Sequence, residues 1–290
     1  MIYRCYQAPP GMADPKVICT LPEGHDDCHV AQLLGGQPIA FWSDTDELVM
    51  DPAQQGVLTY RTLVLRRNPR QSRPPSPYER VWQGRYYEVW QRDPDYQASR
   101  LIVHHPLGGG FQPAVVPNCA VVQSVAAEAG QSGKVVAAIR EPNAVANLTV
   151  YPPDWVPDPP NKTLTPLSDG TATGQVVIPE SGEYRVWVGG SARGKVSVEI
   201  GGQDAGSALG ILNNNAQFIS LDDLDFEAGT DLVAMSYEKG SDLRPATGGY
   251  PFGIGPVILE PAADPEVVTV SPGNAQKLCG RSLDWIEAVR

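Results

Sequence analysis

The clearest pattern in the chain is an alternation of apolar and polar residues over positions 179–203. Two segments, 183–189 and 195–200, place an apolar residue at every second position, as half-buried strands do. The apolar residues that share these faces are Val186, Val188, Val196, Val198 and Ile200. A glycine-rich turn over 189–194 separates the segments, so the pattern predicts a β-hairpin.

Similar short apolar runs, separated by turn residues, continue over positions 163–260. The strands expected from them cover 163–166, 173–178, 183–189, 195–200, 206–211, 216–220, 231–237 and 256–260. Many short strands with frequent turns are typical of antiparallel sandwiches. We therefore predict a jelly-roll β-sandwich over about residues 160–260.

The rest of the chain predicts a smaller unit of mixed character. Strands are expected at 61–67, 79–83, 85–91 and 101–104, and helices at 30–34, 119–129 and 281–289. The proline-rich segment 68–77 excludes regular structure and predicts an extended connector, and the proline-rich segment 151–160 predicts a hinge before the sandwich. The overall prediction is a mainly β protein. Residues 1–155, completed by 261–290, form a mixed α/β unit in which the sandwich is inserted or to which it is appended.

Composition narrows the possible partners of this 290-residue chain. With 29 glycines and 28 prolines, the chain favours turns and short strands over long helices. A net charge of −11 argues against binding to nucleic acid and to anionic membrane surfaces. Met1 is followed at once by a strand-like segment, so we expect the chain to be a piece of a longer protein.

The chain contains five cysteines, and two of them, Cys119 and Cys279, form either a disulfide or two free thiols. Cys119 and Cys279 each open a helix-like run, and a bond between them closes a loop of about 160 residues. The alternative is a pair of buried thiols. The disulfide would imply an oxidising compartment. The pairing of Cys5, Cys19 and Cys28 stays open.

Two segments resemble known families. Residues 181–203 are similar to carbohydrate-binding-module-like jelly rolls, which hold sugars on a loop rim or concave face. Residues 61–92, with the segments 117–119 and 279–287, resemble the C-terminal extracytoplasmic part of actinobacterial polytopic membrane glycosyltransferases of the GT-C type. That resemblance implies attachment to the cell membrane through an upstream region. It also implies that the catalytic carboxylates lie outside this chain.

Candidate sugar-binding residues lie on the sandwich. Sugar rings are bound by aromatic platforms together with planar polar groups that pair with hydroxyls. Trp187 is out of phase with its neighbours Val186 and Val188, which places it on the outer face as a candidate platform. The candidate set is Asn213, Asn214, Asn215, Gln217, Tyr237, Asp242, Arg244, Tyr250 and Trp187. The alternative is that the asparagines form a turn and the aromatic residues cap a sandwich edge.

Other chemistry-bearing groups are weaker candidates. Asp222, Asp223 and Asp225 supply the oxygen ligands that calcium prefers, although a solvated turn explains them equally well. Residues 19–29 contain cysteine and histidine without the spacing of a zinc site. His104 precedes a glycine-rich loop, but the chain has no nucleophile motif of the Gly-x-Ser-x-Gly kind.

These observations lead to three functional hypotheses. The first is a non-catalytic, extracytoplasmic region that binds a cell-wall polysaccharide and positions it as an acceptor. It would belong to a membrane glycosyltransferase. We expect it to need no cofactor; if an ion is bound, calcium is the candidate. The second is a structural docking domain that packs on its own membrane-embedded part or on a partner protein. The third is a glycoside hydrolase, whose paired carboxylates no sequence pattern reveals.

Overall fold

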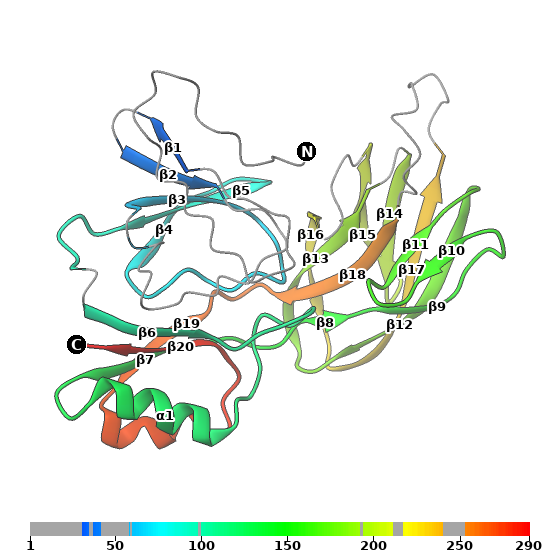
Figure 1. The fold of residues 1–290 in the computed structure, drawn as a ribbon. Helices are drawn as coiled ribbons and strands as arrows, with labels where there is room; N and C mark the ends of the chain where they lie inside the picture. Colours follow the sequence, from blue (N-terminus) through cyan, green and yellow to red (C-terminus); the bar gives the residue numbers. More distant parts are fainter. Residues whose placement is uncertain are drawn as a thin grey trace.

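A computed structural model describes residues 31–34, 37–41, 58, 60–97, 100–191, 194–210, 217–239 and 253–290. Four sheets make up most of this part of the chain, and Figure 1 shows them in two groups that lie beside each other. The prediction of a mainly β protein that contains a β-sandwich is confirmed. No helix among the described residues has the length and apolar character needed to cross a membrane.

The sandwich consists of two sheets, which we call the inner and the outer sheet. The inner sheet has the order β10-β11-β18-β13-β16, and β8 adds to β18. Its strands are β8 (Ala144–Val145), β10 (Val156–Asp158), β11 (Thr163–Thr165), β13 (Gly182–Gly190), β16 (Phe218–Phe226) and β18 (Ile254–Pro261). The outer sheet contains β9 (Asn147–Val150), β12 (Gly170–Ile178), β14 (Lys195–Ile200), β15 (Gln203–Leu209) and β17 (Gly229–Glu238), in the order β15-β14-β17-β12-β9.

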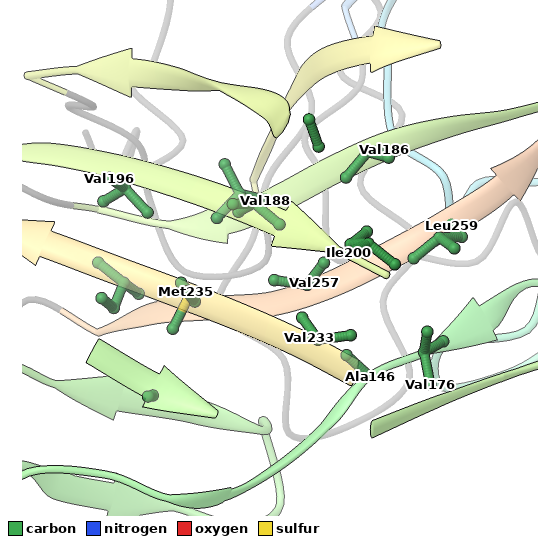
Figure 2. Close-up of a cluster of buried hydrophobic side chains, with 14 of the residues drawn as sticks. Ala146, Val176, Val186, Val188, Val196, Ile200, Val233, Met235, Val257 and Leu259 are labelled. Carbon is green, nitrogen blue, oxygen red and sulfur yellow. The ribbon is translucent and has the colours of Figure 1, made fainter. Parts of the chain in front are cut away.

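Alternating apolar residues from both sheets meet between them. Figure 2 shows Val186, Val188, Val257 and Leu259 of the inner sheet facing side chains of the outer sheet. The facing residues include Val176, Val196, Ile200, Val233 and Met235. Because each strand buries every second residue here, the period-two pattern in the sequence follows from this core.

The expected hairpin between 183–189 and 195–200 is wrong. β13 pairs with β16 and β18, whereas β14 pairs with β15 and β17. The chain after Gly190 therefore crosses from the inner to the outer sheet. Alternation fixes which residues of a strand face the core, but it does not fix the neighbouring strand.

Two further sheets form the other group. The N-terminal sheet has the order β1-β2-β3-β5-β4, with β2 and β3 parallel. Its strands are β1 (Ala31–Leu34), β2 (Gln37–Phe41), β3 (Thr62–Arg66), β4 (Tyr78–Gln83) and β5 (Tyr87–Arg92). The expected helix at 30–34 is wrong, since β1 pairs with β2. A segment this short is more stable when its backbone hydrogen bonds are made to a neighbouring strand than as an isolated helical turn.

The C-terminal sheet joins segments from before and after the sandwich. It has the order β19-β7-β20-β6. Its strands are β6 (Leu101–Pro106), β7 (Lys134–Ile139), β19 (Glu266–Val270) and β20 (Leu283–Val289). The strand β18 runs from the sandwich toward this sheet in Figure 1.

One face of the C-terminal sheet is covered by α1 (Cys119–Ala129) and the 3-10 helix η4 (Pro272–Leu278). The Asn118 side chain caps α1 by accepting a hydrogen bond from the amide of Ala120 at 3.0 Å. The expected helix at 119–129 is confirmed. The residues that α1 buries are Val122, Val125, Ala126 and Ala129.

The helix expected at 281–289 is wrong, because this segment forms β20. The segment contains the two acids Asp284 and Glu287. Both are completely buried, as are the apolar residues between them. A central strand covered on both faces loses the period-two alternation, so its sequence does not distinguish it from a helix.

Candidate functional site

A cleft of about 330 Å³ lies between the two groups of sheets. One wall is formed by β4, β5 and the connector, residues 67–77, which joins β3 to β4. The other wall is formed by β13 and by residues 260–265 after the sandwich. The volume is within the range of small-ligand sites.

Buried carboxylates hold the proline-rich connector in place. Asp284 accepts a hydrogen bond from the Arg73 amide, and Glu287 accepts one from the Ser76 amide, both at 3.0 Å. The His104 Nδ1 atom lies 2.7 Å from the same Glu287 carboxylate. Burial raises the pKa of Asp284. Since prolines have no N–H group, these few amides must fix the connector, and the acids of β20 provide acceptors for them.

Two indole rings lie beneath arginine side chains in the cleft. The guanidinium carbon of Arg67 lies 5.1 Å from the centre of the Trp187 ring. Those of Arg73 and Arg80 lie 5.1 Å and 5.8 Å from the centre of Trp90. Such stacking orients a planar guanidinium while leaving its edge available for hydrogen bonds.

Ion pairs connect the two walls. Arg80 on β4 contacts both oxygens of Asp264, at 2.8 and 2.6 Å. Glu260 on β18 binds Arg140 through one oxygen and the Trp187 Nε1 atom through the other. These contacts join residues far apart in the sequence, so the cleft depends on both groups of sheets.

Glu88 on β5 differs from the other carboxylates of the cleft. Burial raises its pKa, although Trp90 and Arg80 act in the opposite direction. Its nearest arginine nitrogen, on Arg80, is 3.9 Å away. A carboxyl group with a raised pKa is a candidate proton donor as well as a hydrogen-bond partner for a ligand.

Most of the candidate residues named from the sequence lie outside the described residues. These are Asn213, Asn214, Asn215, Asp242, Arg244 and Tyr250. Gln217 precedes β16, and its carbonyl accepts a hydrogen bond from the Gly190 amide at 3.0 Å. A sugar site at the rim of the sandwich therefore stays a prediction.

Neither Trp187 nor Tyr237 forms an open platform. Trp187 does point away from the sandwich core, but it is only 2% exposed. It packs with Phe218 and Ile258, and Phe111 from the other group of sheets covers it. Tyr237 is 8% exposed and packs edge-on against Trp155 inside the sandwich. In both cases neighbouring aromatic or apolar groups occupy the surface that a sugar ring would need.

The three aspartates of β16 do not converge. Asp223 is bound by Arg185 on β13 through two hydrogen bonds, at 2.9 and 2.8 Å. Asp222 lies next to it along the strand and so faces the opposite side. No cluster of three or more metal-ligating side chains occurs in the described part of the chain. The calcium prediction gains no support from this arrangement.

The disulfide between Cys119 and Cys279 is present. It joins the start of α1 to the residue after η4, with a Cα–Cα distance of 5.2 Å. The bond therefore ties the middle of the chain to its C-terminal sheet.

The arginines and Glu88 of the cleft were missed as site residues. Residues 67–73 and 79–88, which supply Glu88 and three of the arginines, entered the sequence analysis only through the resemblance of residues 61–92 to membrane glycosyltransferases. The one available signal was the high density of arginine around the prolines, in a chain of negative net charge.

No protein-family model and no curated protein matches the chain. Among solved structures, it is similar to a family 35 carbohydrate-binding module from Clostridium thermocellum, with 15% identity and a TM-score of 0.26 over 41% of this chain and 91% of the module. It is also similar to the CBM35 module of Abf62 from Cellvibrio japonicus, with 11% identity and a TM-score of 0.25 over 46% of this chain and 96% of the module. The similarity to the Podospora anserina GH26-CBM35 β-(1,4)-mannanase has 14% identity and a TM-score of 0.28 and covers 45% of this chain. It covers 28% of the mannanase, so the chain spans under a third of that enzyme. At these identities and TM-scores, the similarity decides nothing about ligand or activity.

Proposed function

We propose that this chain is a non-catalytic carbohydrate-binding region and that a glycan occupies the cleft. The observation that carries this proposal is the convergence of planar hydrogen-bonding groups from both walls. They are the guanidinium groups of Arg80 and Arg185, the Glu88 carboxyl group and the Gln83 amide. Planar groups of this kind pair with neighbouring hydroxyls of a sugar.

Recognition in the cleft would rely on hydrogen bonds rather than on ring stacking. Both tryptophans are buried, and arginines lie above their rings. A hydroxyl-rich ligand gains little by leaving water, so we expect micromolar or weaker affinity for a single site.

The carboxylates favour binding over hydrolysis. A glycosidase needs a second carboxylate, as a base or nucleophile, besides its acid. Glu88 has the raised pKa of an acid, but both oxygens of Glu260 and both of Asp264 are engaged within the protein, and Glu79, the remaining carboxylate of the lining, lies at an exposed position. We therefore propose that the region binds glycans without cleaving them.

The wider context of the proposal is the cell envelope. The region would lie outside the cytoplasm and hold a cell-wall polysaccharide as the acceptor for a membrane glycosyltransferase. The catalytic and membrane-embedded parts would lie elsewhere in the parent protein. Support comes from the resemblance of residues 61–92 and 279–287 to such portions. The Cys119–Cys279 disulfide also supports it, because such bonds are typical of oxidising compartments.

Calorimetric titration with arabinan, galactan and mannan oligosaccharides tests the proposal. We expect Arg80→Ala and Gln83→Ala to weaken binding by about tenfold each, because each removes a hydrogen-bonding group from the cleft. Arg85→Ala is the matched control: Arg85 lies in the same hairpin, stacked on Tyr86, and does not line the cleft. Absence of binding to every glycan would contradict the proposal, as would cleavage of a bound oligosaccharide.

An exposed aromatic surface on β4 and β5 favours a second candidate, the docking domain. Trp82 is 55% exposed and Tyr87 45% exposed, on the side of the sheet away from the cleft. Such a surface is typical of contacts with another protein. If docking is the function, Trp82→Ser will abolish co-purification with the membrane-embedded part, and glycan titrations will show no binding.

A further inference from the structure

Arginines gather in the cleft although the chain as a whole is acidic. The net charge is −11, yet the lining contains Arg67, Arg73, Arg80, Arg140 and Arg185. Four carboxylates, those of Glu79, Glu88, Glu260 and Asp264, line the same cleft, so the pairing of each arginine matters more than the number of arginines. The state of each arginine decides whether the cleft has charge available for a ligand.

Three of the five arginines already have a carboxylate partner. Arg80 pairs with Asp264 at 2.6 Å, Arg140 with Glu260, and Arg185 with Asp223 at 2.8 Å. These pairs neutralise most of the positive charge at the walls.

A fourth arginine, Arg73, serves the connector. Its guanidinium lies between Trp90 and Trp285 and donates to the carbonyls of Pro74 and Tyr78. Because its N–H groups donate to carbonyls of the connector and of β4, we do not assign Arg73 to ligand binding.

Arg67 has no carboxylate oxygen within 4 Å among the described residues. Its Nη1 atom donates to the Gly84 carbonyl at 3.2 Å, and its guanidinium lies over the Trp187 ring. The carbonyl and the ring fix the orientation of the guanidinium without neutralising its charge. Ordering before binding removes part of the entropy cost of recognition.

Arg185 brings a further hydrogen-bond donor to the same place. Its Nε and Nη2 atoms donate to Asp223, which leaves Nη1 without a partner in the part of the chain that the structure describes. Burial lowers the pKa of Arg67 and the charge of Arg185 lowers it further, whereas Glu260, Glu88 and Asp223 act in the opposite direction. A ligand oxyanion beside both arginines would further favour their charged forms.

We propose that Arg67, with Arg185 beside it, binds an oxyanion carried by the glycan, either a carboxylate or a phosphate group. The inference rests on the proposed glycan-binding function and narrows its ligand to acidic glycans. A planar guanidinium matches both oxyanions with paired hydrogen bonds.

Matched neutral and acidic sugars test this inference. Galactan and mannan oligosaccharides are titrated beside the same compounds with their C6 groups oxidised to carboxylates, and beside the C6-phosphorylated compounds. We expect at least one acidic form to bind about tenfold more tightly than its neutral parent. The acidic form with the larger gain identifies the oxyanion. Raising sodium chloride from about 50 mM to about 500 mM should reduce this gain, because salt screens charge.

A variant pair assigns the effect to Arg67. We expect Arg67→Gln to remove the preference for the acidic form over its neutral parent. Arg85→Gln should leave both affinities unchanged. If Arg67→Gln does not fold, the comparison of neutral and acidic sugars on the unmodified protein still decides.

The outcomes separate this inference from the proposed function. Equal binding of neutral and acidic forms overturns the oxyanion site but leaves glycan binding in place. A preference that survives Arg67→Gln overturns the assignment to Arg67. Absence of binding to any neutral or acidic form contradicts the proposed function and, with it, this inference.

Discussion

Individual charged residues of the cleft are largely buried. Glu88 is the clearest case, because burial raises its pKa while the opposing contribution of Arg80 acts over 3.9 Å. A carboxyl group whose pKa is higher in the folded state than in the unfolded chain binds more protons when folded. Glu88 therefore contributes most to the free energy of unfolding at pH values below its pKa in the unfolded chain. This contribution is lost as the pH rises through its pKa in the folded protein.

Glu88→Gln should remove this pH dependence. We expect the free energy of unfolding of the variant, relative to the unmodified protein, to increase from about pH 4 to about pH 7, because glutamine does not ionise. Urea unfolding at several pH values measures it. Glu79→Gln, at an exposed position on the neighbouring β4, is the control and should show no such increase. A difference for Glu88→Gln that stays constant across this range would contradict the account.

At the scale of secondary structure, the sandwich was predictable from sequence, whereas strand pairing was not. All eight strand segments expected over 163–260 correspond to β11 through β18, since each buries alternate residues in one core. The hairpin was wrong because β13 and β14 use the same alternation in different sheets. β20 was mistaken for a helix because it is buried on both faces and therefore lacks the alternation of a half-buried strand.

The candidate site was much less predictable than the fold. The cleft combines a connector, a hairpin and the end of the sandwich, which lie up to about 200 residues apart, and no local pattern brings such segments together. Trp187 shows the difficulty. Its phase correctly placed it outside the sandwich core, but the sequence did not show that Phe111 would cover it.

The disulfide should stabilise the contact between α1 and η4. In the chain-entropy model, a bond closing a loop with a sequence separation of 160 contributes about 5 kcal/mol. We expect reduction, or Cys119→Ser with Cys279→Ser, to lower the free energy of unfolding by up to about this amount. Thiol titration of denatured, unreduced protein checks the bond itself, and five free thiols would contradict it.

At the scale of the whole molecule, buried contacts join the sandwich to the rest of the chain. Glu260 is central, because it binds Arg140 from the C-terminal sheet and Trp187 from the inner sheet. Glu260→Ala would remove the closer of the two carboxylates that face Arg140 and the acceptor of the Trp187 Nε1–H group, and a buried donor left without a partner costs about 1–3 kcal/mol. We expect calorimetry to show a lower unfolding temperature and a separation of one transition into two.

Asp264→Ala gives the matched comparison for Glu260→Ala. It also breaks an ion pair across the cleft, but Asp264 is mostly exposed. Exposed pairs contribute about 0–1 kcal/mol, so the unfolding temperature should change little. Equal effects of the two substitutions would contradict the assignment of Glu260 as the main contact between the two groups of sheets.

The central claim is that a glycan binds in the cleft between the sandwich and the neighbouring sheets. Amide hydrogen exchange of the whole chain, with and without a saturating oligosaccharide from the titrations, tests it most directly. The account predicts slower exchange in residues 67–73 and 260–265, which form opposite walls of the cleft. Slower exchange confined to segments outside the cleft, such as β14, β15 and β17, would contradict it.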